Sequence, residues 1–400
     1  MGRKVVPWKR TSPEVEQFRF IQRWETGGDT FVELCRAFGV SRKTGYKRVH
    51  RFQAWGWDGL GDLCRAPRQH LNQTERAVAE RLIAARLSHP TWGPKKLVAW
   101  LADRQPWVRR PAPSTVGNLL DHAGLVRRRK GRRRTAPWSQ PFVQAEQPND
   151  LWCIDFKGWF RTRDGVRVNP LTVEDASSRY LLACHGLRQP RGPQVRQVLE
   201  RAFREYGLPW AIRTDNGPPF ASVGLGGLSS LAVWWVKLGI LPERIEPGHP
   251  EQNGRLERLH RTLKAETASP PQPTWQRQQR AFQDFRSSYN QERPHEALEQ
   301  QPPARHYCPS ARPYPRRVDS PVYEFGTTVR RVRTNGEIKW QGGRIYLSEA
   351  LCGEPVGLTQ QDDRYWAISF GPLQIGLLDC YAHRTLHMPT LVLPMSPVYM

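Results

Sequence analysis

The sequence is short of acidic residues and of long apolar runs, and each shortage narrows what the chain can do. Its 400 residues include 37 aspartates and glutamates against 61 lysines and arginines, a formal net charge of +24. Such an excess favours a polyanionic partner, and nucleic acid fits better than a membrane. No apolar run approaches the ~18 residues that a bilayer span requires. The opening MGRKVVPWKR also lacks the apolar segment of a signal peptide.

Paired cysteines are missing as well. The seven cysteines are odd in number, scattered, and never spaced as CxxC. This pattern is typical of buried free thiols in a reducing cytoplasm and argues against a structural zinc site.

Two short apolar runs each carry one acid. Leu151–Lys157 (LWCIDFK) holds Asp155 in its middle, and Trp210–Gly217 (WAIRTDNG) ends in Asp215 before an Asn-Gly turn. An acid within a buried strand costs several kcal/mol unless it is paired or binds a metal. An acid at the carboxyl end of a strand is well placed to line a crevice. The two runs therefore predict strands that present carboxylates.

A third acid lies on a predicted helix, Asn253–Lys264. Helical periodicity places three leucines on one apolar stripe, and Glu257 on a neighbouring face with groups that suit an anion. A carboxylate among such groups suggests a shared metal ion. A surface helix with i,i+4 ion pairs is the alternative.

Four motifs occur in order: WCIDFKG, RTDNGPPF, PGHPEQNGRLERLHRTLK and YNQERPHEAL. They resemble the catalytic core of insertion-sequence transposases in the retroviral-integrase superfamily, the DDE enzymes. The resemblance implies a ribonuclease-H-like core over residues 149–307. It also implies two Mg²⁺ ions, for which Mn²⁺ can substitute, held by Asp155, Asp215 and Glu257. The groups expected to position DNA beside them are His260, Arg261 and Lys264.

Other acids compete for the third position or have a structural role. Because the gap from Asp215 to Glu257 is long for this superfamily, Glu246 and Glu251 remain alternatives. Asp164 falls in a predicted hairpin turn, and Asp175 is expected to bond locally to Ser177 or Ser178.

Residues 8–66 predict a helix-turn-helix domain. Helices are expected over 13–25, 30–38 and 42–55, with Ser41 as an N-cap. The last helix would offer its basic and aromatic residues to a major groove; the alternative is a three-helix bundle with a solvated basic face. These residues are Arg42, Lys43, Tyr46, Lys47 and Arg48.

Residues 70–126 resemble a second helix-turn-helix domain, with Lys95 and Lys96 as candidate DNA contacts. A basic linker follows over 127–148. Its run RRRKGRRR, which includes Arg128 and Arg133, must remain solvated and suits phosphate contact; a nuclear signal is the alternative reading.

Residues 318–385 alternate short apolar runs with turn signals at Asn335-Gly336 and 361–363. They predict a small C-terminal β-barrel, which would bind DNA or pack on another subunit.

The expected fold class is α/β and multidomain. The expected function is DNA transposition by metal-dependent strand cleavage and strand transfer. The partners would be double-stranded DNA, as terminal inverted repeats and target, and further copies of the chain, in a bacterial cytoplasm at the nucleoid. A catalytically silent DNA-binding repressor and a ribonuclease-H-type nuclease are the alternatives.

Overall fold

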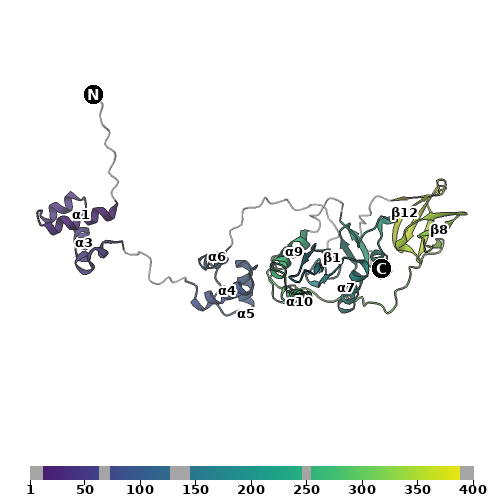
Figure 1. Ribbon diagram of the computed structural model, residues 1–400, viewed down its shortest axis with the longest axis horizontal. Helices are drawn as coiled ribbons and strands as arrows, with labels where there is room; N and C mark the ends of the chain where they lie inside the picture. Colours follow the sequence, from purple (N-terminus) through teal and green to yellow (C-terminus); the bar gives the residue numbers. More distant parts are fainter. Residues whose placement is uncertain (1–11, 63–72, 127–144, 246–253, 388–400) are drawn as a thin grey trace, which may run out of the picture. The chain divides into compact units, whose positions relative to one another are not determined.

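A computed structural model describes residues 12–62, 73–126, 145–245 and 254–387. The chain divides into two compact units, residues 1–73 and 74–400 (Figure 1). No helix in the described ranges is long and apolar enough to cross a membrane.

The first unit is the predicted trio of helices, α1 (Pro13–Thr26), α2 (Phe31–Ala37) and α3 (Arg42–Trp55). Each helix begins at a hydroxyl side chain that accepts a backbone N–H, so each N-terminus is fixed by its own sequence. Gly45 lets α3 approach α2 closely, because a Cβ there would lie 2.7 Å from the Cys35 sulfur. The sequence therefore predicts this unit almost to the residue.

The second unit begins with another helical trio, α4 (Arg76–Ser88), α5 (Pro94–Arg104) and α6 (Pro113–His122). Its small core is formed by Leu82, Leu97, Leu101 and Val116, none of which is exposed.

A mixed sheet follows, with strand order β2-β3-β1-β5-β6 and β4 paired on β3. The pairs β1–β5 and β5–β6 are parallel, and β1–β3 and β3–β4 are antiparallel. This is the arrangement expected of a ribonuclease-H-like core. The strands are β1 (Leu151–Phe156), β2 (Phe160–Arg161), β3 (Arg167–Asp175), β4 (Leu181–Leu187), β5 (Ala211–Thr214) and β6 (Leu241–Arg244).

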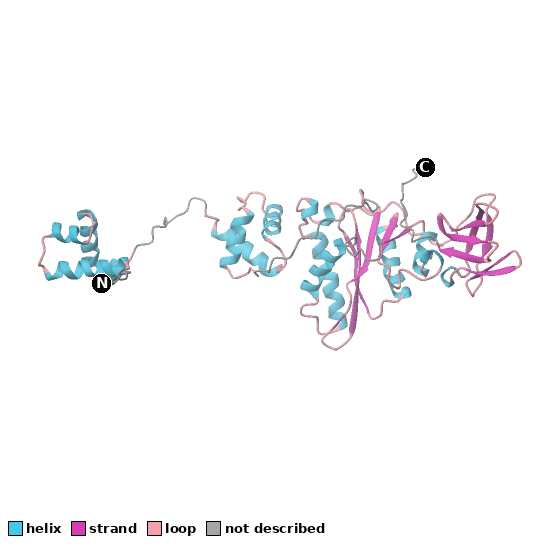
Figure 2. Ribbon diagram, turned by 90° about the horizontal axis from the view of Figure 1, so that it is seen from above, coloured by secondary structure: helices cyan, strands magenta, loops and turns pink. Residues whose placement is uncertain are grey.

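Helices cover both faces of this sheet (Figure 2). One face packs on α7 (Gly192–Tyr206) and α8 (Ser230–Lys237), the other on α9 (Gly254–Thr267) and α10 (Trp275–Gln291). Because successive strand residues alternate between faces, Trp152 and Ile154 join the first core, whereas Leu151 and Cys153 join the second. Asp155 follows the second set and faces α9.

The C-terminal strands form an open sheet of order β13-β12-β11-β10-β7 and a separate hairpin, β8–β9. The predicted closed barrel is not confirmed, since in the described part of the chain β8 and β9 pair only with each other. The strands are β7 (Thr328–Arg331), β8 (Glu337–Trp340), β9 (Gly343–Tyr346), β10 (Pro355–Gln360), β11 (Tyr365–Phe370), β12 (Leu373–Asp379) and β13 (Arg384–His387).

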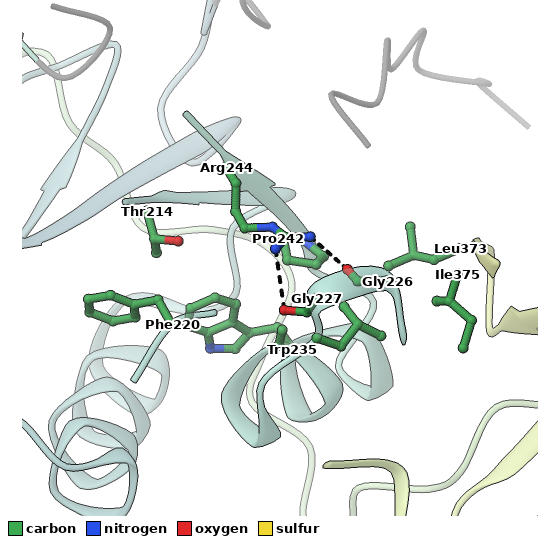
Figure 3. Close-up of a pocket in the computed structure, with 11 residues that line it drawn as sticks. Thr214, Phe220, Gly226, Gly227, Trp235, Pro242, Arg244, Leu373 and Ile375 are labelled. Atoms are coloured by element: carbon green, nitrogen blue, oxygen red, sulfur yellow. Dashed lines mark hydrogen bonds between the residues drawn. The ribbon is translucent and has the colours of Figure 1, made fainter. Parts of the chain in front are cut away.

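The C-terminal sheet shares one continuous apolar core with α7 and α8. Figure 3 shows a pocket at this junction, lined by Leu373 and Ile375 of β12 and by Trp235 of α8. The Arg244 guanidinium closes the pocket by donating to the carbonyls of Gly226 and Gly227. These contacts join the two sheets into one folded body.

Candidate active site

Strand register brings the first two predicted acids together. In the parallel pair β1–β5, Cys153 lies opposite Arg213. Asp155 and Asp215 come two residues further along the chain, Asp155 near the end of β1 and Asp215 just after β5, so both carboxylates lie at the carboxyl edge of neighbouring parallel strands. This is the edge at which open α/β sheets bind their ligands.

Helix α9 brings the third acid to the same edge. Leu256, Leu259 and Leu263 are at most 2% exposed, as the predicted apolar stripe requires, and Glu257 remains exposed. The negative charges of Asp215 and Glu257 both raise the pKa of Asp155. Glu257 therefore remains the candidate for the third acid.

Burial is the main reason that the pKa of Asp155 rises to about 7, and the nearby Asp215 is the second. Burial also raises the pKa of Asp215. Asp155 accepts a backbone N–H from Phe156 at 2.7 Å, and Asp215 accepts one from Gly217 at 3.2 Å. These few donors compensate poorly for two buried, mutually repelling charges.

Asp175, an acid of the same sheet, has several hydrogen-bond donors and a structural role. Its carboxylate accepts hydrogen bonds from the Asn149 N–H at 2.7 Å, the Ser178 N–H at 2.8 Å and the Ser178 hydroxyl at 2.6 Å. The predicted local bonding to Ser178 is confirmed. Asp164 is likewise held within its turn by Thr162 and Val166.

The donor chemistry of the three acids fits hard divalent cations, which prefer carboxylate oxygens. Within the described ranges, no group of three His, Cys, Asp or Glu side chains is close enough to hold a metal as it stands. The sheet fixes Asp155 and Asp215, whereas the exposed Glu257 side chain can adopt several rotamers. Glu257 would therefore have to turn toward the aspartates to complete a metal site.

His260 lies inside the protein and not on the surface where DNA contact was expected. It is 5% exposed, and its Nε2 lies 2.8 Å from the Thr172 hydroxyl. Its Nδ1 lies 3.8 Å from the Asp155 carboxylate. Burial, and then the charge of Lys157, lower its pKa to about 4, so the ring is neutral at pH 7.

Thr172 is a site residue that the sequence analysis missed. It pairs with Asp155 across β1–β3, and its hydroxyl also approaches the Asp155 carbonyl at 3.3 Å. Neither motif nor spacing points to it, because its position depends on strand register.

The residues predicted to bind DNA have different surroundings. On α3, Arg42, Lys43 and Lys47 are exposed, and Tyr46 is 51% exposed and stacked on Phe31. Arg48 donates instead to the Leu60 carbonyl at 2.8 Å and to Asp62 at 3.1 Å.

The two candidate lysines of helix α5 both contact the segment that follows α10. The ammonium of Lys95 lies 2.9 Å from Glu296, and that of Lys96 donates to the Pro294 carbonyl. Burial is the main cause that lowers the pKa of Lys96 to about 8.

On α9, Arg261 and Lys264 are exposed, as a DNA-facing role requires. The candidates Arg128 and Arg133, and the alternative acids Glu246 and Glu251, lie outside the described residues.

Comparison with known families agrees with this arrangement. Integrase core domain models match residues 145–250 and 238–303. A helix-turn-helix domain model matches residues 18–68, and a homeodomain-like domain model matches 44–120.

Two relatives are proteins of insertion elements. The chain is 31% identical over 234 residues to an uncharacterised protein of insertion element IS476 from Xanthomonas euvesicatoria, covering 57% of this chain and 64% of that protein. It is 32% identical over 188 residues to one of insertion element IS407 from Burkholderia multivorans, covering 46% and 64%. The matches thus span slightly less than two thirds of each relative.

Among solved structures, the chain is similar to the HTLV-2 integrase catalytic core domain in complex with magnesium, with 16% identity and a TM-score of 0.31. That similarity covers 41% of this chain and 97% of the other.

The family models thus match an integrase core preceded by helix-turn-helix modules. The resemblance to insertion-sequence transposases of the DDE/retroviral-integrase superfamily is confirmed.

Proposed function

We propose that this protein is a DNA transposase, which binds the ends of a mobile element and catalyses strand cleavage and strand transfer. The observation that carries the proposal is the pair of buried carboxylates, Asp155 and Asp215, at the carboxyl edge of neighbouring parallel strands, with few hydrogen-bond donors to compensate their charge. Glu257 on α9 would complete the set. A repressor has no use for such a costly cluster.

The three acids would hold two Mg²⁺ ions, or Mn²⁺ in their place. When bound, the metal pair supplies charge stabilisation at phosphorus and activates the attacking oxygen, first of water and then of a 3′-hydroxyl. The residues of the chain keep this arrangement in place. Asp155 and Asp215 hold their oxygens on rigid strands, and the neutral His260 ring, fixed by Thr172, limits the movement of Asp155.

The basic surface would position the substrate. Arg261 and Lys264 lie on the exposed side of the helix that carries Glu257, so both can meet DNA phosphates beside the acids. Arg42, Lys43, Tyr46 and Lys47 on α3 would read the element's inverted repeat. The linker cations Arg128 and Arg133 would contact phosphates.

Pairing two element ends with a target requires more than one catalytic core, so we propose a homo-oligomer assembled on DNA, at the nucleoid of a bacterial cell. If the open C-terminal sheet and the β8–β9 hairpin close into a barrel, we expect the closure to occur when the copies assemble on DNA.

The test replaces one carboxylate at a time. Asp155→Asn, Asp215→Asn and Glu257→Gln should each reduce cleavage and joining of the element's end by at least about 1,000-fold and leave end binding nearly unchanged. Asp164→Asn is the matched control, since that carboxylate belongs to a turn, and it should retain full activity.

Three results would separate the alternatives. Glu251→Gln abolishing activity while Glu257→Gln retains it would move the third ligand. Wild-type protein that binds ends without cutting them would be a repressor. Wild-type protein that cuts RNA–DNA hybrids and never joins ends would be a nuclease.

A further inference from the structure

A cleft opens beside the acids, between α9 and the segment that joins β1 to β2. Its rim is formed by Lys157, Trp159 and Lys264, and its floor by Phe160, Leu263 and Phe282. The cavity volume is about 110 Å³. None of the described residues that line it carries a carboxylate.

Trp159 stands exposed at this rim. The indole is 57% exposed, although tryptophan is among the side chains with most to gain from burial. Gly158 precedes it with φ at +88°, a conformation that turns the chain outward between the strands. The guanidinium carbons of Arg167 and Arg161 lie 4.7 and 6.0 Å from its ring centroid.

Two guanidiniums, those of Arg161 and Arg167, therefore lie at the exposed ring, and two lysines, Lys157 and Lys264, line the same cleft. Cations alone suit any phosphate, and an aromatic ring alone suits many apolar partners. The two together suit a nucleotide, because a base can stack on the ring while its phosphates meet the cations. A base can stack in this way only when it has left its own duplex stack.

The cleft lies close to the chemistry. Lys157 directly follows β1, two residues after Asp155, so it leaves the strand next to the first candidate metal ligand. Lys264 follows Glu257 by seven residues on α9, about 10 Å along the helix axis. A strand held at the three acids would thus have its next nucleotide at this cleft.

We propose that the cleft binds the unpaired terminal nucleotide of the DNA strand being processed, with its base stacked on Trp159 and its flanking phosphates on Lys157 and Lys264. The inference rests on the proposed function and deepens it, because it assigns the protein a step that unpairs the DNA end. Strand opening would be coupled to the entry of the scissile phosphate among the acids.

Trp210 provides a matched control. It is 58% exposed, and the Arg312 guanidinium lies 4.2 Å from its ring centroid, so exposure and cation contact resemble those of Trp159. It precedes β5, whereas Asp215 follows that strand. Trp210 is thus at the edge of the sheet away from the acids.

The test is a double-mutant cycle with full-length protein in metal-free buffer. The probe is a duplex from the DNA that flanks the gene, with its terminal nucleotide either intact or abasic. Removing the base should weaken wild-type binding about ten-fold. Trp159→Ala should lose about the same on intact DNA and lose nothing more on abasic DNA. Trp159→Phe should keep most of the affinity, and Trp210→Ala should behave as wild type.

A terminal 2-aminopurine gives a second readout, since stacking on Trp159 should quench its fluorescence in the wild-type complex and not in the Trp159→Ala complex. Equal losses on intact and abasic DNA would mean that Trp159 serves the DNA backbone or the fold, and would overturn the inference. Normal binding by Trp159→Ala would do the same. If wild-type protein cuts and joins ends while the cycle is additive, this inference alone fails. If wild-type protein neither binds nor cuts the end, both proposals fail.

Discussion

The two helical modules use a similar sequence pattern for different purposes. Both are trios of short helices with a basic helix among them. In the first module, α3 leaves Arg42, Lys43 and Lys47 exposed. In the second, α5 directs Lys95 and Lys96 to residues that follow α10.

A set of polar contacts, here called the docking seam, attaches the second module to the core. At its centre Arg293 donates to Glu266 at 2.9 Å and to the Thr91 hydroxyl at 3.0 Å. Arg104 pairs with Glu292 at 3.1 Å, and Arg305 pairs with Asp103. The basic helix α5 thus attaches the second module to an acidic segment of its own chain. The two modules therefore differ in what the rest of the chain offers them and not in their own helices.

Deleting residues 1–73 should have the largest effect on DNA recognition. Because this unit is compact by itself, the remainder should keep its melting temperature. Discrimination between the element's end and random duplex should fall by about 100-fold or more, since base readout would be lost. Competition binding at fixed salt measures it, and unchanged discrimination would assign base readout to the second module.

Glu266→Ala should damage the docking seam. It leaves the Arg293 guanidinium, 9% exposed, without its carboxylate, and we expect a loss of about 2 kcal/mol in the free energy of unfolding. Glu80→Ala is the control, because its pair with Arg76 is largely exposed and should contribute under about 0.5 kcal/mol. Equal denaturant midpoints for the two variants would show that the seam does not stabilise the fold.

Acid should weaken the same region. Burial, and then the charge of Lys96, lower the pKa of His295 to about 3. The unfolded state therefore binds more protons below about pH 6.5, so stability is fully present above that pH and falls as pH drops toward 3. Between pH 6.5 and 4.5, His295→Gln should flatten the decline by about 2 kcal/mol. Parallel curves for variant and wild type would contradict this.

Lys95→Ala should have the smallest effect. Its pair with Glu296 is exposed on both sides, so stability should change by less than about 0.5 kcal/mol. If Lys95 has no phosphate partner, the salt dependence of DNA binding should also stay the same, whereas Lys47→Ala should reduce its slope by about one. A reduced slope for Lys95→Ala would return α5 to the DNA-contacting surface.

What the sequence predicted and what it missed differ by the range of the interactions involved. The helix cap Ser41 and the apolar stripe of α9 act over three or four residues and are readable in the sequence. The pairing of Thr172 with His260 spans 88 residues, and that of Lys96 with Pro294 spans 198. Such pairings depend on strand register and packing, which no local pattern encodes. His260 therefore lies on the predicted helix, but its side chain is buried and not on the predicted DNA-facing surface.

The shared core of the two sheets limits how the chain can be divided. A fragment ending near residue 317 would keep every predicted metal ligand, yet it would uncover the side of α8 that packs on Gly371 and break the 2.6 Å pair of Lys237 with Glu354. Such a fragment should aggregate when overproduced. For the same reason, exchanging C-terminal sheets between relatives would succeed only when α8 and the 224–228 loop are exchanged with them. Natural exchange of C-terminal segments between related genes should therefore occur more often upstream of β5 than within residues 302–317.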